Sequence, residues 1–231
     1  MTEFIAASAY FGLVLTIGIY ILAAALYKRH KLVLLNPFLL TTVAVILVLV
    51  ATSISNEAYQ NSANFLNYLL VPATVCFAVP IYRNAKTIVK YKWTVAASVL
   101  TGAITSITSV MVLGRLFWLD DAIVKSMIPE NATTAIAIGI SQEIGGIVPI
   151  TMLAVVVAGL AGNIAARTIM RTLKIQSPIA RGLAIGTASH IVGTAKAFEM
   201  GRTEGAFASL SIAITGLTLA ISIPIIILLT G

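Results

Sequence analysis

Residues 206–229 read AFASLSIAITGLTLAISIPIIILL, a run of 24 residues without one charged side chain. About 20 mostly apolar residues suffice to cross a bilayer as a helix. The run therefore predicts a membrane span and decides the class of the fold. Five further apolar stretches of similar character lie upstream, at about residues 4–27, 32–54, 65–81, 93–118 and 147–166.

The overall composition agrees with this class. The 231 residues are 59% hydrophobic and only 10% charged, and the mean hydropathy is +1.01. A soluble domain carries roughly a quarter charged residues, so a soluble enzyme and a disordered chain are both excluded. We predict an all-α polytopic membrane protein with about six full transmembrane helices and two re-entrant or broken helical segments.

The net charge of +7 is explained by topology. Basic residues concentrate after the first, third and fifth stretches, whereas the alternate connections are acidic or nearly free of bases. Short loops rich in Lys and Arg stay in the cytoplasm, which places both termini outside. We expect a retained first span, contact with the lipid bilayer and no nucleic-acid partner. Cys76 is the only cysteine, so no intrachain disulfide can form.

Two segments, residues 129–146 and 178–199, do not read as simple spans because Gly, Pro and polar residues interrupt them. Residues 137–146 (AIGISQEIGG) align with residues 184–193 (AIGTASHIVG), although coincidence remains an alternative in so Ala-, Ile- and Gly-rich a chain. If each unit holds one re-entrant segment and one full span, the second is inverted, as in many secondary transporters. Within one membrane domain this gives four spans in residues 1–118, repeat unit one in 119–175 and unit two in 176–231.

Half-helices that end inside a membrane aim unpaired N–H groups at a common point, which suits an anionic group. Polar residues of the two segments are the candidate substrate-binding residues: Asn131, Thr133, Thr134, Ser141, Thr187, Ser189, His190 and Thr194. Glu143 and His190 align between the two copies and are candidates for carrying a coupling proton. The structural alternatives are a hydrogen-bonded core histidine and a carboxylate at the outer interface.

Three further features have both a functional and a structural interpretation. A span broken by Pro72 and Pro80 could line a cavity with Asn67, Pro72 and Thr74, or simply kink. The small polar face of the fourth span favours helix packing over a pore lining; its residues are Ser98, Thr101, Gly102, Thr105, Thr108 and Ser109. Lys196 and Glu199 read as a local helical pair, and Arg181 as a cytoplasmic topology charge. No catalytic, metal-binding or nucleotide-binding motif is present, so we predict neither an enzyme nor a cofactor.

The run ARGLAIGTASHIVGTAKAFEMG at residues 180–201, followed by EGAF at 204–207, resembles the signature of the LrgB/CidB family of bacterial membrane proteins. Residues 71–82 (VPATVCFAVPIY) and 129–146 also match that pattern. The resemblance covers nearly the whole chain. It departs at Glu130, where the family commonly has Lys, and at Ala135, where it commonly has Pro.

The resemblance implies a multi-pass protein of the bacterial inner membrane that works with a small holin-like LrgA/CidA-type partner. In such a membrane, the charge pattern predicts periplasmic termini. Relatives have been associated with transport of pyruvate, glycolate or glycerate, and with murein hydrolase export and autolysis. We therefore expect a secondary transporter of small monocarboxylates, including lactate, coupled to protons. The alternative is a non-transporting regulator that acts through the holin-like partner. The sequence leaves open whether the chain forms a homo-oligomer.

Overall fold

A computed structural model describes residues 8, 10–30, 35–69, 72 and 75–230. The described residues form helices and short connections, and none of them lies in a strand. Four of these helices are long and apolar enough to cross a membrane, by length and composition. The protein is thus an all-α polytopic membrane protein, as predicted. The chain divides into two compact units, Met1–Cys76 and Phe77–Gly231.

The first unit contains α2 (Phe11–His30), α3 (Pro37–Thr52) and α4 (Asn56–Tyr68). The side chain of Asn36 caps α3 by accepting hydrogen bonds from the Phe38 and Leu39 amides at 2.9 and 3.3 Å, which satisfies donors that a helix start leaves free. Helix α2 packs closely on α4, and the Gly12 amide donates a hydrogen bond to Ser62 Oγ at 2.9 Å. A Cβ on Gly12 would overlap Ser62 and Tyr59.

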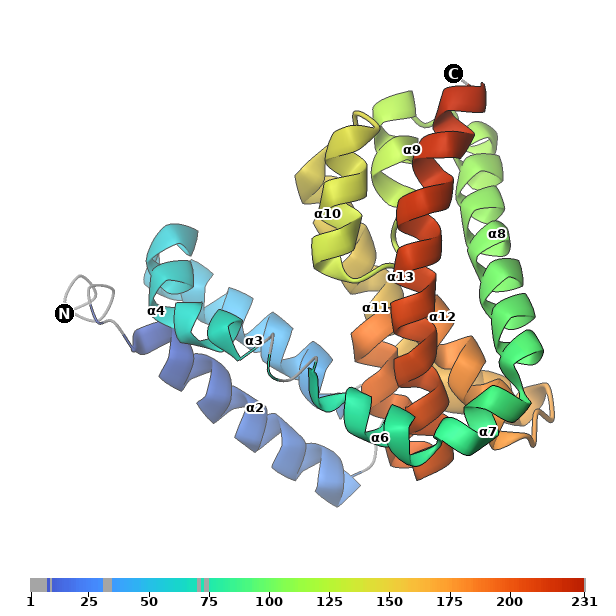
Figure 1. The fold of residues 1–231 in the computed structure, drawn as a ribbon. Coiled ribbons are helices and arrows are strands. Elements are labelled where there is room, and N and C mark those ends of the chain that lie inside the picture. Colours follow the sequence, from blue (N-terminus) through green and yellow to red (C-terminus); the bar gives the residue numbers. More distant parts are fainter. Residues whose placement is uncertain (1–7, 9, 31–34, 70–71, 73–74, 231) are drawn as a thin grey trace. The chain divides into compact units, whose positions relative to one another are not determined.

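The second unit contains α6 (Ala78–Arg83), α7 (Ala85–Lys90), α8 (Lys92–Leu116), α9 (Asp121–Met127), α10 (Thr134–Glu143), α11 (Val148–Thr172), α12 (Pro178–Met200) and α13 (Arg202–Thr230). Within it α12 contacts α8, α11 and α13, while α13 also contacts α6, α8 and α10 (Figure 1). Leu183, Phe207 and Leu219 are fully buried. The unit's core is thus built around α12 and α13.

Five of the six predicted spans correspond to helices, and one of them is shorter than predicted. Helices α2, α8, α11 and α13 match four of them, and α3 is a shorter apolar helix where the second was predicted. The third, predicted over residues 65–81, lies partly outside the described residues; α4 covers its start as far as Tyr68, and α6 begins at Ala78. Residues 56–64, predicted as a loop, are helical because Tyr59 and Ser62 pack on α2. The division into repeat units and the inverted orientation remain predictions.

Candidate functional site

Helix α12 is broken near its middle, between Thr187 and Ile191. Ser189 has φ −140° and ψ 18°, and His190 has φ 39° and ψ −138°, whereas the residues on either side are helical. A positive φ is rare for any residue other than glycine. Such backbone strain persists only where surrounding structure enforces it, and it clusters at functional sites. The second segment is therefore a broken helix, and the break falls on two of the predicted site residues.

The break is held by hydrogen bonds to its own residues. His190 Nε2 lies 2.9 Å from the carbonyl oxygen of Val155 on α11. Because a carbonyl only accepts, Nε2 must carry the proton in this contact. Thr194 Oγ1 donates to the His190 carbonyl at 2.9 Å. Both side chains are buried, so the His190 ring is hydrogen-bonded inside the core; its role as a proton carrier stays a prediction.

Glycines on α11 make room for the two break residues. A Cβ on Gly162 would overlap Ser189 Oγ, and a Cβ on Gly159 would meet the His190 ring at 2.6 Å. These glycines are three positions apart, so they lie on one face of the helix. On the same helix, Asn163 Nδ2 donates to the Val192 carbonyl at 2.6 Å, just beyond the break. Helix α11 therefore provides a small-residue surface fitted to the non-helical backbone.

A cavity of about 700 Å³ lies beside the first half of α12, before the break. Its walls are α8, the turn that precedes α10, and α12 as far as Ala188. The lining residues are Ala97, Ser98, Thr101, Gly102, Thr105, Ser106, Ser109, Glu130, Asn131, Ala180, Leu183, Ala184, Thr187 and Ala188. The size falls within the usual range for small-molecule sites. The polar face predicted on α8 thus lines a cavity, except for Thr108.

Two predicted site residues meet at this cavity. Asn131 Nδ2 donates to the Thr187 carbonyl at 3.2 Å, which joins the two polar segments although 56 positions separate the residues. Thr187 packs its methyl group against Gly102 of α8, where a Cβ would overlap it. The structure thereby brings together one member of each predicted segment.

Unpaired polar atoms gather at the same cavity. In the described part of the chain, five buried side-chain oxygens have no hydrogen-bond partner, and three of them belong to cavity-lining residues: Ser106 Oγ, Asn131 Oδ1 and Thr187 Oγ1. A buried polar atom left unpaired costs about 1–3 kcal/mol. Such atoms are few in native proteins, so a concentration of them around one cavity indicates a place where another molecule or another conformation supplies partners.

The remaining predicted residues lie elsewhere. Ser141 is buried and accepts a hydrogen bond from Thr151 Oγ1 at 2.7 Å, which ties α10 to α11. Thr133 precedes α10 without capping it by its side chain. Thr134 and Glu143 are exposed at the two ends of α10. None of these four residues lines the cavity between α8 and α12.

The cavity predicted at the proline-broken span lies largely outside the described residues. Pro72 is exposed. Thr74 and the side chain of Asn67 lie outside the described residues. This part of the prediction stays a prediction.

The charges of α12 are paired locally. Lys196 Nζ lies 2.6 Å from Glu199 Oε2, the helical pair predicted from their spacing. Arg181 donates from Nε to the Ile175 carbonyl at 2.7 Å, and its Nη1 lies 3.9 Å from Oε1 of the buried Glu204. Arg181 also lines a pocket of about 350 Å³ with three further bases, Arg167, Arg171 and Lys174. These four belong to the segment that the charge pattern places in the cytoplasm.

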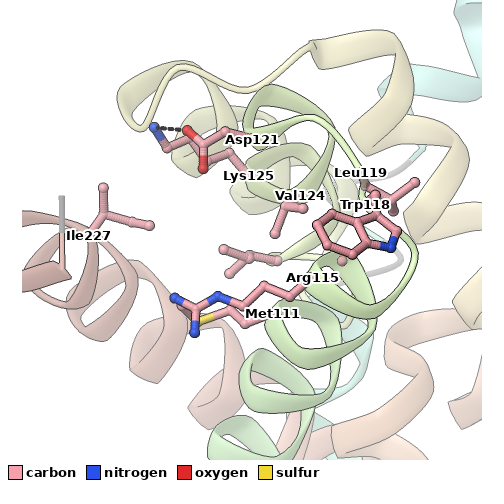
Figure 2. Close-up of a pocket in the computed structure, with 10 residues that line it drawn as sticks. Met111, Arg115, Trp118, Leu119, Asp121, Val124, Lys125 and Ile227 are labelled. Carbon is pink, nitrogen blue, oxygen red and sulfur yellow. Dashed lines mark ion pairs between the residues drawn. The ribbon is translucent and has the colours of Figure 1, made fainter.

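A second large pocket, of about 760 Å³, lies at the C-terminal end of α8. Figure 2 shows Arg115 and Trp118 on one side of it and the Asp121–Lys125 pair, 2.6 Å apart, on the other. Trp118 is 93% exposed. None of the unpaired buried oxygens noted above belongs to a residue that lines it. It is a weaker candidate for a functional site than the cavity beside the break.

Sequence reasoning missed several residues of the site. Glu130 entered only as a departure from a family pattern, although it lines the cavity beside Asn131. Ser106, Gly159 and Asn163 were not singled out. Their signal, a small or polar residue on an otherwise apolar helix, exists in the sequence, but their partners lie far away along the chain.

Comparisons with known proteins give a consistent family. The sequence model of the LrgB-like family matches residues 16–229. The antiholin-like protein LrgB of Bacillus subtilis (strain 168) is 36% identical over 225 residues, which cover 97% of each chain. The protein of the same name in Bacillus mycoides (strain KBAB4) is 35% identical over 216 residues, which cover 93% of this chain and 94% of its own. No solved structure matches the chain. Matched over almost its whole length by both comparisons, the chain belongs to the LrgB-like family.

Proposed function

We propose that this membrane protein restrains the activity of a small holin-like membrane protein. The observation that carries the proposal is the end-to-end similarity to proteins named antiholin-like, which covers 97% of this chain and of the Bacillus subtilis relative. Four helices long enough to span a membrane support action within the bilayer. The similarity is spread over the whole length of the aligned residues and is not confined to one segment.

The test is a leakage assay in lipid vesicles. A small holin-like membrane protein from the same organism is reconstituted with an entrapped dye, and this chain is added at rising molar ratio. We expect dye release to fall severalfold as the ratio approaches one. An unrelated polytopic protein of similar mass controls for dilution. Unchanged release at every ratio, with insertion verified by flotation, would contradict the proposal.

A second candidate function is secondary transport of a small polar solute. The observation that favours it is the strained break in α12 beside a cavity with three unpaired oxygens. Non-helical backbone at membrane depth is tolerated where it is surrounded by protein or lines a cavity, and interrupted helices hold the substrate in many transporters. This candidate function includes a monocarboxylate substrate and a coupling proton. Glu143 and His190 would carry the proton.

Uptake of labelled pyruvate, glycolate and lactate into vesicles that contain the chain, with and without the holin-like protein, tests this candidate. Saturable uptake that His190→Ala abolishes would favour transport. If the chain only restrains its partner, His190→Ala and Glu143→Gln should leave dye retention intact, and none of the three acids should enter faster than into empty vesicles. The two readouts separate the two functions.

A further inference from the structure

The cavity between α8 and α12 has an unusual charge for a carboxylate site. Among the residues that line it, Glu130 is the only ionisable one; the others are small, hydroxyl-bearing, amide or apolar. The nearest base along α12, Arg181, is engaged by the Ile175 carbonyl and Glu204 and does not line the cavity. An anionic ligand would therefore meet a carboxylate and find no cation to pair with.

The polar atoms around this cavity also favour a cationic ligand over an anionic one. Asn131 Nδ2 already donates to the Thr187 carbonyl, so its free oxygen can only accept a hydrogen bond. An ionised Glu130 also only accepts, whereas the hydroxyls of Ser106 and Thr187 can do either. A wall rich in hydrogen-bond acceptors favours a ligand that carries several hydrogen-bond donors. A protonated amine offers three donors, a positive charge and no acceptor.

The ion pairs of this unit leave Glu130 available. The ion pairs found among the described residues join Lys125 to Asp121, Arg181 to Glu204 and Lys196 to Glu199. Glu130 is half-buried in the turn before α10, where a carboxylate loses part of its hydration. A desolvated charge is retained in proteins chiefly when it is paired or functional, and a cationic ligand would supply the missing counter-ion.

We infer that this cavity binds a small organic cation that bears a protonated amine, with Glu130 as its counter-ion and Asn131, Thr187 and Ser106 as hydrogen-bond partners. Asn131 Oδ1 and the two hydroxyl oxygens are shielded from water in this conformation, so binding includes rotation of these three side chains toward the cavity. The amine can belong to a free solute or to an amine-bearing lipid headgroup. The inference goes beyond the proposed function, because such a site can regulate a restraining protein as well as serve a carrier.

The experiment compares three probes of similar size: ethanolamine, glycolate and ethylene glycol. Thermal unfolding of the full chain is followed in nanodiscs of phosphatidylglycerol, which contain no amine lipid. We expect a saturable rise in Tm with ethanolamine and none with the other two. Glu130→Gln should weaken the ethanolamine response at least tenfold, and Glu130→Lys should transfer the response to glycolate.

The matched control is Glu57→Gln, which removes the same charge at an exposed position of α4 outside the cavity and should respond like the original chain. If Glu130 variants fail to fold, Ser106→Ala and Thr187→Val keep the test decisive. Each removes an unpaired buried hydroxyl, so basal Tm should hold or rise while the ethanolamine affinity falls severalfold. Nanodiscs with added phosphatidylethanolamine distinguish the lipid source: a Tm rise there that Glu130→Gln abolishes, without a response to free ethanolamine, assigns the amine to a headgroup.

Two results would overturn the inference: a larger response to glycolate than to ethanolamine in the original chain, or an amine response from either source that survives Glu130→Gln. The dye-release assay keeps this outcome separate from the proposed function. That assay uses the original chain without added amine, so the proposed function can hold while the amine response fails, and the reverse.

Discussion

His190 has a backbone conformation that is unfavourable for its residue type. Its φ of 39° and ψ of −138° are the mirror image of an ordinary extended conformation, which glycine adopts at little cost and other residues avoid. The chain nevertheless places a histidine there, because the ring reaches the Val155 carbonyl from that backbone. One buried hydrogen bond to α11 thus accompanies a local strain of about 1–3 kcal/mol.

This balance predicts an order of stability for substitutions at position 190. His190→Ala keeps the strain and loses the hydrogen bond, whereas His190→Gly loses the hydrogen bond and relieves the strain. We expect the Gly variant to be more stable than the Ala variant by about 1 kcal/mol, because the relieved strain exceeds the ~0.5–1 kcal/mol entropic cost of glycine. Thermal unfolding in detergent measures it. Ala188→Gly, at the helical residue before the break, is the control and should be destabilising.

Gly162 gives a second prediction at this scale. A Cβ there would overlap Ser189 Oγ, so Gly162→Val should cost about 1–3 kcal/mol through overpacking. Gly139 of α10 has no atom within 4 Å of a built Cβ, and Gly139→Ala should be neutral or slightly stabilising. Equal effects of the two substitutions on Tm would show that α11 and the break are not in close contact.

At the scale of the helices, α10 depends on α11 through one buried hydroxyl pair, Thr151 Oγ1 to Ser141 Oγ at 2.7 Å. The Ile147 amide, just before α11, donates to Ser126 Oγ of α9 at 2.6 Å, which ties the start of α11 to α9. The Ser141–Thr151 bond holds α10 on α11, and a helix only ten residues long is by itself too short to be stable. The burial of Ser141, a predicted substrate-binding residue, therefore has a structural explanation.

The Ser141–Thr151 pair can be tested by a double-mutant cycle. Thr151→Val leaves Ser141 without its donor and should cost about 1–3 kcal/mol, with a smaller cost for Ser141→Ala. The double variant should recover most of the loss, which gives a coupling of about 0.5–3 kcal/mol. Thr172→Val, on the exposed end of α11, is the neutral control. Strict additivity of the two single costs would reject the pairing.

Helix α12 shows which part of an element is readable from sequence. Polar residues among Gly and Ala predict that the segment is broken, and it is. The position of the break is not readable, because Ser189 and His190 carry no local signal such as Gly or Pro. It depends on Gly159 and Gly162 of α11, some 30 positions upstream. The position of Glu130 in the cavity wall is not readable for the same reason, because it depends on a turn that binds the Thr187 carbonyl through Asn131.

For the whole molecule, composition predicts class and charge predicts orientation. Low charge and long apolar runs suffice for an all-α membrane protein, because few other folds satisfy backbone groups in lipid. Apolar length was less reliable for the element boundaries. Residues 56–64 are polar enough to read as a loop, yet they form most of α4 because Ser62 and Tyr59 bind α2. Tertiary contacts with α2 thus make this segment helical, although its polar composition favours a loop.

Orientation provides the prediction at this scale. Helix α8 runs from a basic segment with Lys86, Lys90 and Lys92 to the acidic pair Asp120 and Asp121. Its 25 residues extend for about 37 Å at 1.5 Å per residue, enough to cross the apolar core of a bilayer. Helix α11 returns toward the bases Arg167, Arg171 and Lys174. Short basic segments are retained in the cytoplasm, so the two basic ends should lie inside and the acidic end outside.

Cysteine labelling tests this orientation in a Cys76→Ser background, since Cys76 is exposed. Phe117→Cys, at the exposed end of α8, should react with a membrane-impermeant maleimide in intact spheroplasts. Gln176→Cys, exposed after α11, should react only after the membrane is permeabilised. The parent without cysteine is the blank. If both positions react from the same side, α11 does not cross the membrane from the acidic to the basic side, and the lysine-rich segments owe their charge to something other than topology.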